Sequence, residues 1–196
     1  KCLHGFGKGR RLVAVALGAH ETNKAYSAEL YAEALAEIAA KYPVGFILLG
    51  GPADQSAGNL IVGKLPEGMA MDLSGKTSLR ESAAVLARTS VYIGNDTGLT
   101  HMAAALKRVI LEINREAEDC PKTMISLYAR FFPWQTPAIV LRPQKAAGNC
   151  ASVISQGGCV AGEPHCIKKI LPDDIMAAYI NLQIVLYKTD SHYYWR

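Results

Sequence analysis

The seven residues from Asn95 to His101, Asn-Asp-Thr-Gly-Leu-Thr-His, bring polar side chains and a glycine close together in the chain. They follow the short apolar run 91–93 and precede an alanine-rich segment, so they form a polar connection between two stretches that we expect to be buried. Gly98 leaves space for a ligand, and a helix that begins near it would direct unpaired backbone N–H groups into that space. Asp96 stands at this helix start either as a ligand contact or as an N-cap, and His101 would lie one turn into the helix.

Three other short loops show the same combination of small and polar residues. They are Gly18-Ala19-His20, Gly50-Gly51-Pro52 and Ser74-Gly75-Lys76-Thr77. Each of them follows an apolar run, and in an open parallel sheet ligands bind beyond the carboxyl ends of the strands. Four such loops at one edge would suit a phosphate or diphosphate, because small residues let the ligand approach the backbone amides.

Apolar runs and helical periodicity predict the elements that must hold these loops in place. We expect strands at residues 12–17, 44–52, 69–75, 91–93, 109–113 and 139–141, and helices at 27–41, 54–64, 78–88, 99–106 and 173–184. Ser78 and Glu81 have the spacing of a capping box, and Pro172 opens the last helix. The alternation of strands and helices predicts an α/β fold, with a parallel sheet covered by helices on both faces. Residues 114–137 are expected to form an irregular insertion.

Length and composition narrow the class of protein. The chain has 196 residues, 50% of them hydrophobic and 19% charged, so we expect one domain, residues 1–196, around a sizeable core. A net charge of +4 with only small basic clusters, at 8–11 and 168–169, does not fit a nucleic-acid surface but suits an anionic small molecule. No run approaches 18 apolar residues, so we expect no transmembrane segment. Because the chain starts at Lys1 without a methionine or signal peptide, we expect it to be part of a longer protein.

Several familiar motifs are incomplete or missing. Ser-Gly-Lys-Thr at 74–77 resembles the end of a P-loop, but Ala70 stands where that motif needs glycine. The sequence contains no Gly-x-Gly-x-x-Gly fingerprint after a strand, no Gly-x-Ser-x-Gly elbow and no Asp-x-Asp pair. We therefore expect no NAD, no other cofactor and no catalytic metal.

The cysteines leave two alternatives open. An odd count of five, without the density of a disulfide scaffold, favours a reducing cytosol. Cys150, Cys159, His165 and Cys166 could supply four zinc ligands, which would make the chain a non-enzymatic metal-binding interaction domain. Their spacing is irregular, and adjacent His165 and Cys166 are awkward for tetrahedral coordination, so free thiols are favoured.

Residues 73–106, LSGKTSLRESAAVLARTSVYIGNDTGLTHMAAAL, resemble the donor-binding half of glycosyltransferase family 9, the ADP-heptose:lipopolysaccharide heptosyltransferases. The similarity continues upstream in GAHETNKAYSAELYAEALAEI and FILLGGPAD, so that residues 12–111 are the best matched part. The Asp-Thr-Gly-x-x-His stretch is its most specific element. Residues 158–180, GCVAGEPHCIKKILPDDIMAAYI, are similar to the cysteine-containing tail that precedes the last helix, here 172–186, in many members.

This resemblance implies a Rossmann-like domain that forms the C-terminal half of a two-domain GT-B glycosyltransferase. The N-terminal acceptor domain, with the catalytic base, would lie outside this chain, which alone would bind a nucleotide weakly and catalyse nothing. The resemblance further implies transfer of a heptose from ADP-heptose to the lipopolysaccharide core, with inversion and without a metal. The protein would be cytoplasmic, at the inner face of the inner membrane.

The family pattern assigns roles to three residues in the first loops of the chain. Lys24 would face the diphosphate as a point charge, although a lone lysine is more often a solvated surface residue. Asp54 falls near the acidic residue that holds the ribose hydroxyls, where the family usually has glutamate. Thr77 would line the base pocket.

The same pattern assigns four residues to the sugar and phosphate end. Asp96 would bind sugar hydroxyls, and His101 would lie close to the sugar or the phosphate. Thr97 and Gly98 would offer backbone N–H groups to phosphate.

The sequence departs from the family in two places. The common Phe-Gly-Pro-Thr is replaced by residues 113–116, Ile-Asn-Arg-Glu, and by a long segment containing ARFFPW at 129–134. Arg115 or Arg130 could replace lost phosphate contacts or could be surface charges. Ala25 and Tyr26 stand where a tryptophan is expected. These departures leave open a GT-B enzyme with another donor, such as a UDP-sugar.

Overall fold

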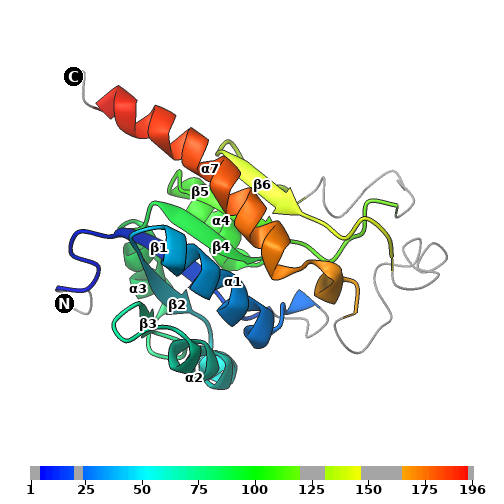
Figure 1. Ribbon diagram of the computed structural model, residues 1–196, viewed down its shortest axis with the longest axis horizontal. Coiled ribbons are helices and arrows are strands. Elements are labelled where there is room, and N and C mark those ends of the chain that lie inside the picture. Colours follow the sequence, from blue (N-terminus) through cyan, green and yellow to red (C-terminus); the bar gives the residue numbers. More distant parts are fainter. Residues whose placement is uncertain (1–4, 20–23, 120–130, 147–164, 194–196) are drawn as a thin grey trace.

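A computed structural model describes residues 5–19, 24–119, 131–146 and 165–193 of the chain. These residues form an α/β domain with one six-stranded sheet (Figure 1). Its strands are β1 (Arg11–Ala16), β2 (Val44–Leu49), β3 (Ala70–Asp72), β4 (Val91–Asn95), β5 (Val109–Ile113) and β6 (Ala138–Leu141). Its α-helices are α1 (Ala28–Lys41), α2 (Gln55–Lys64), α3 (Leu79–Leu86), α4 (Gly98–Ala105) and α7 (Pro172–Tyr193), with short 3-10 turns at Pro52–Asp54 and Ile167–Lys169.

The strands are parallel throughout and lie in the order β3-β2-β1-β4-β5-β6. This is the strand order of a Rossmann fold, and it confirms the predicted α/β class. The chain moves outward from β1 to β3 and then returns to place β4 on the other side of β1. The switch point therefore lies between β1 and β4, where a crevice opens beyond the carboxyl ends of the strands.

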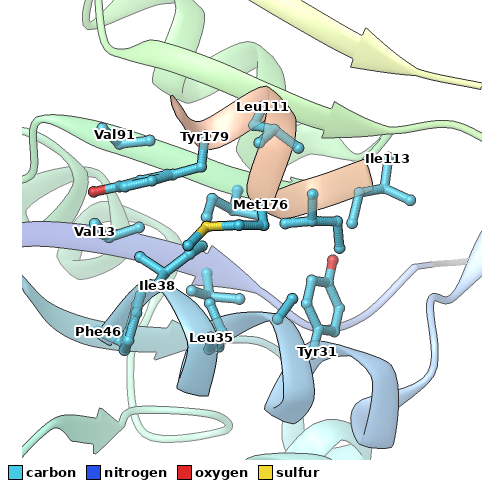
Figure 2. Packing of buried hydrophobic residues seen from close by; sticks show 14 of the residues in the cluster. Val13, Tyr31, Leu35, Ile38, Phe46, Val91, Leu111, Ile113, Met176 and Tyr179 are labelled. Atoms are coloured by element: carbon cyan, nitrogen blue, oxygen red, sulfur yellow. The ribbon is translucent and has the colours of Figure 1, made fainter. Parts of the chain in front are cut away.

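Helices cover both faces of the sheet, as predicted. α1, α2 and α7 bury one apolar layer against the side chains of β1, β2, β4 and β5 that point to that face. Figure 1 looks onto this face, with α1 and α7 in front of the sheet. Figure 2 shows the layer from within, with Leu35 and Ile38 of α1 and Met176 and Tyr179 of α7 gathered over Val13. The opposite face is covered by α3 and α4.

Local sequence signals explain where the helices start. Ser27 caps α1 by accepting a hydrogen bond from the backbone N–H of Leu30. The predicted capping box of α3 is present in both directions, because Ser78 N–H donates to Glu81 Oε2 at 2.8 Å and Glu81 N–H donates to Ser78 Oγ at 3.3 Å. Asp174 Oδ2 accepts from Leu171 N–H at the start of α7.

Several predicted boundaries are wrong. β2 ends at Leu49 and β3 at Asp72, whereas the prediction extended these strands to residues 52 and 75. β4 continues for two residues beyond Ile93, because Gly94 and Asn95 pair with Glu112 and Ile113 of β5. α7 continues to Tyr193 instead of ending near 184–186. Its polar last turns show no apolar period that would have predicted a helix. No helix within the described ranges combines the length and apolar character needed to cross a bilayer.

Glu112 is a charged residue inside this apolar sheet. It is only 1% exposed, its Oε1 accepts a hydrogen bond from Asn114 Nδ2 at 2.8 Å, and its Oε2 has no partner among the described residues. Burial raises the pKa of this carboxyl from its ordinary value of 4.5 to about 7, and nearby Asp96 pushes the pKa in the same direction. The hydrogen bond from Asn114 and the charge of Lys24 offset part of this rise.

Glu112 should therefore make the folded state less stable as the pH rises from about 4.5 through about 7. In that window the carboxyl is ionised in the unfolded chain and protonated in the folded chain. Folding therefore takes up a proton, and its free energy becomes less favourable as the pH rises. Glu112→Gln cannot ionise, and its stability relative to the wild type should rise between pH 5 and pH 8 by up to roughly 3 kcal/mol. Urea unfolding at both pH values measures this difference. Exposed Glu67→Gln is the matched control, and an equal difference at the two pH values would contradict the assignment.

Candidate functional site

A cavity of about 500 Å³ opens at the carboxyl edge of the sheet. The loops that follow β1, β2, β3 and β4 form it together. It is lined by Gly18, Ala19, Lys24, Gly50, Gly51, Ala53, Asp54, Thr77, Leu79, Ser82, Asp96, Thr97, Gly98 and Leu99. Six of the seven residues predicted from the sequence are in this lining, and the seventh, His101, contacts one of them.

The strand order arranges these residues along the edge. Because β3, β2, β1 and β4 are successive neighbours, their loops place Thr77, Asp54, Lys24 and Asp96 in that order. The two carboxylates are thus separated by the lysine. A long ligand that lies along the edge would meet hydroxyl-binding groups near its ends and a cation near its middle.

Asp96 is the centre of a small cluster of ionisable side chains. Its Oδ2 lies 3.7 Å from Lys24 Nζ, and its Oδ1 lies 3.8 Å from His101 Nε2. The side chains of Asp96, Lys24 and His101 are 15%, 23% and 43% exposed, respectively, so they are accessible to a ligand. The alternative role of Asp96 as N-cap of α4 is wrong, because Thr97 occupies that position.

The start of α4 is held by the hydroxyl of Thr100. Thr100 Oγ1 donates to Asn95 O at 2.6 Å and accepts from Thr97 N–H at 3.2 Å, and Tyr92 OH lies 2.9 Å away. These contacts use the donor and both acceptor positions of one hydroxyl. Thr100 is fully buried, and its place in an alanine-rich helix was the only sequence signal for this role.

The backbone donors at this helix start differ from those predicted. Thr97 N–H is already bonded to Thr100, so it is not available as predicted. Gly98 and Leu99 both line the cavity, and their N–H groups have no hydrogen-bond partner within the described part of the chain. Gly98 is not among the glycines with a positive φ, and a Cβ added there would meet nothing within 4 Å, so the glycine leaves open space beside the helix start.

Asn95 joins the two sides of the crevice. Its side chain is fully buried, its Nδ2 donates to Leu17 O at 3.2 Å, and its Oδ1 accepts from Tyr26 N–H at 3.3 Å. The sequence placed Asn95 in the polar loop but did not predict this role. A buried polar side chain at the end of an apolar strand is the signal that points to such a link.

Lys24 is positioned through Tyr26, two residues further on. Tyr26 is buried, lies edge-on against Tyr31 with ring centroids 4.9 Å apart, and donates its hydroxyl to Ile170 O at 2.7 Å. Burial raises the pKa of Tyr26, so the hydroxyl stays protonated as a donor. The tyrosine that replaces the expected tryptophan therefore fixes the end of the lysine loop.

Asp54 lies against the backbone between β1 and β2. Its Oδ2 accepts from Gly51 N–H at 2.7 Å, while Oδ1 has no partner among the described residues. A Cβ at Gly18 or at Gly50 would overlap this carboxylate, so both glycines make its position possible. Gly75 has a φ of +67° and packs against Pro52, which brings the Thr77 loop beside Asp54.

Other residues named from the sequence lie away from the cavity or cannot be placed. Arg115 is described but is not in the cavity lining. His20, Arg130, Cys150 and Cys159 lie outside the described residues. Among the residues that are described, no three His, Cys, Asp or Glu side chains converge as metal ligands would. Buried Cys166 has its Sγ 3.0 Å from Nδ1 of the adjacent His165.

Taken together, the cavity combines the groups that an elongated anion with hydroxyls needs. The ammonium of Lys24, and the two backbone N–H groups that have no partner among the described residues, can bind the oxygens of a diphosphate. Asp54 and Asp96, on either side of Lys24, can accept hydrogen bonds from hydroxyls.

Sequence comparisons agree with this geometry. The profile of glycosyltransferase family 9 (heptosyltransferase) matches residues 2–117. Lipooligosaccharide heptosyltransferase 2 of Haemophilus influenzae is 33% identical over 82 residues, which cover 40% of this chain and 24% of that enzyme. The match thus spans about a quarter of the relative's length.

Two solved structures share the fold. The structure of E. coli ADP-heptose lipopolysaccharide heptosyltransferase II has a TM-score of 0.68 and 22% identity, over 92% of this chain and 48% of that protein. E. coli heptosyltransferase WaaC, solved with ADP-2-deoxy-2-fluoro heptose, has a TM-score of 0.59 and 18% identity, over 89% of this chain and 44% of that protein. The domain thus has the α/β fold of GT-B glycosyltransferases and spans about half of each structure. Since the family profile covers more than half of its residues, this chain belongs to glycosyltransferase family 9.

Proposed function

We propose that this chain is the donor-binding, C-terminal domain of a heptosyltransferase that transfers a heptose from ADP-heptose to the lipopolysaccharide core with inversion. One observation carries the proposal: the loops after β1 to β4 gather six predicted donor-binding residues around a single cavity. The ADP-linked heptose with which E. coli WaaC was solved supports this choice of donor. The reaction would take place at the cytoplasmic face of the inner membrane, where the acceptor would be bound by an N-terminal domain.

The order of residues along the edge gives the donor a direction. The base would lie near Thr77 and Leu79, and the ribose near Asp54. The diphosphate would lie between Lys24 and the free amides of Gly98 and Leu99. The sugar would then extend past Asp96 toward His101, on the side of β4.

This orientation assigns the chain a role in stabilising the leaving group. The acceptor hydroxyl would attack the anomeric carbon, and a base from the N-terminal domain would take its proton. As the bond to the diphosphate breaks, negative charge grows on the phosphate oxygens. Lys24 and the two amides would stabilise that charge more strongly in the transition state than in the ground state.

The base preference is testable with the 196-residue chain itself. Leu79 lines the cavity although it is 69% exposed, so a bound base would cover its apolar surface. An adenine covers more of that surface than a uracil, and we expect ADP to bind at least about tenfold more tightly than UDP. Calorimetric titration of each nucleotide measures the ratio. A preference for UDP would overturn the heptose donor in favour of a UDP-sugar.

The lysine is expected to contact the diphosphate directly. Lys24→Met should lower the affinity for ADP about tenfold, because a hydrogen bond to a charged group is lost. It should also weaken the fall in affinity between roughly 0.05 and 0.3 M NaCl. Exposed Lys41→Met, at the opposite edge of the sheet, removes the same charge as a control. Equal effects of the two substitutions would point to a general charge effect instead of a contact.

Asp96 is expected to bind the sugar. Asp96→Asn should lower the affinity for ADP-heptose at least about tenfold while keeping the shape of the side chain. The ion pairs that it removes are partly exposed and are worth less than about 1 kcal/mol, so thermal unfolding should change little. Glu67→Gln, which precedes β3 at the opposite edge, is the matched control. Unchanged affinity in Asp96→Asn would count against this site.

A further inference from the structure

Three aromatic residues are exposed in the described part of the connection between β5 and β6. Phe131 is 37% exposed, Phe132 is 40% exposed and Trp134 is 75% exposed. Large apolar side chains exposed together in this way often mark a contact surface. The residues belong to the ARFFPW segment, in which the sequence departs from the family, and they lie beyond the residues that the family profile matches.

This segment is held along α4 and the turn that follows the helix. Lys107 Nζ donates to Gln135 O at 3.0 Å, and Thr136 Oγ1 donates to Arg108 O at 2.7 Å. These bonds tie the segment to the end of α4 near the amino edge of the sheet. Phe131, at the other end of the described segment, lies nearer the carboxyl edge, with its ring centroid 6.3 Å from that of His101 and the rings tilted by 53°.

Phe131 is therefore connected to the cavity by a short chain of contacts. His101 contacts both residues: its ring lies near that of Phe131, and its Nε2 lies 3.8 Å from Asp96 Oδ1. In the strand order, the β5–β6 connection comes after the β4 loop, so Phe131 extends the line of site residues beyond Asp96. This inference rests on the donor orientation proposed above, in which the sugar lies at the Asp96 end of the site.

The chemistry at this end suits a sugar ring. A pyranose has hydroxyls around its rim and patches of C–H groups on its faces. An aromatic ring provides a large, rigid apolar surface for the C–H face, and neighbouring polar groups bind the hydroxyls. The aromatic side chains of this segment offer such rings, and that of Phe131 contacts His101, which itself contacts Asp96.

We propose that Phe131, together with His101, forms a sugar subsite in which the phenyl ring packs against the C–H face of the transferred sugar. The nucleoside and the diphosphate are bound by the loops after β1 to β4. Phe131 acts only on the sugar, and so it determines which sugar is accepted and how tightly it is held.

A comparison of ADP with ADP-heptose tests this subsite. The two probes differ in the sugar and in the charge of the terminal phosphate, and the charge difference is the same for the wild type and every variant. Calorimetric titrations of the 196-residue chain should show that Phe131→Ala weakens ADP-heptose binding about five- to tenfold and changes ADP binding less than about twofold. Phe131→Tyr keeps the ring and should retain the affinity of the wild type for both. Trp134→Ala, in the same segment but without the contact to His101, should also leave both unchanged.

The outcomes separate this inference from the proposed function. If the wild-type chain binds both compounds and Phe131→Ala leaves their ratio unchanged, the sugar subsite is wrong while the donor site stands. An equal loss for ADP and ADP-heptose, or a loss that Phe131→Tyr shares, would show that the phenylalanine shapes the loop and does not pack against the sugar. A wild-type chain that binds neither compound would overturn the donor site and the subsite together.

Discussion

The buried side-chain amide of Asn95 is the interaction on which the candidate site depends. β1 and β4 are neighbours in the sheet, but the helices that follow them, α1 and α4, cover opposite faces. The loops after the two strands therefore diverge and leave a crevice between them. Asn95 spans the opening with bonds to the backbone of Leu17 and Tyr26. Because an unsatisfied amide at this depth would be costly, the link favours one separation between the lysine loop and the start of α4. This link therefore sets the distance between Lys24 and the backbone N–H groups of Gly98 and Leu99, which would bind a diphosphate in the proposed function.

The positive charge of the proposed donor site is also held in position by a neighbouring residue. Asp96 holds the positive charge of Lys24 at the mouth of the crevice, so that charge is in place before a ligand arrives. Prepositioned charge is more effective than charge that must reorganise during binding. Glu112 is buried one strand away, and burial raises its pKa to about 7, so a large part of this carboxyl stays uncharged at neutral pH. The fold thus limits the negative charge that lies behind the site.

The strand order also assigns different parts of the proposed donor to different loops. The loops after β3, β2, β1 and β4 lie side by side in that order. In the proposed orientation, the base of the donor lies near the β3 loop and its sugar near the β4 loop. The loops after β1 to β4 lie within the part of the chain that the family profile matches, whereas the aromatic segment between β5 and β6 lies beyond it. Under the proposed function, the loops within the matched part would bind the nucleotide, and the aromatic segment beyond it would select the sugar.

The sequence alone determined the α/β class, most strands and helices to within a few residues, and most residues around the cavity, but not the end of α7. These features rest on apolar periodicity, caps and glycines, which act over a few neighbouring positions. Tertiary structure decided that β4 includes Asn95 and that this residue binds groups 69 and 78 positions away. It also decided that the amide of Thr97 is occupied and that Glu112 is buried, because both depend on which strands and helices become neighbours. Contacts between distant segments form only when the sheet has assembled, and no local pattern in the chain encodes their partners.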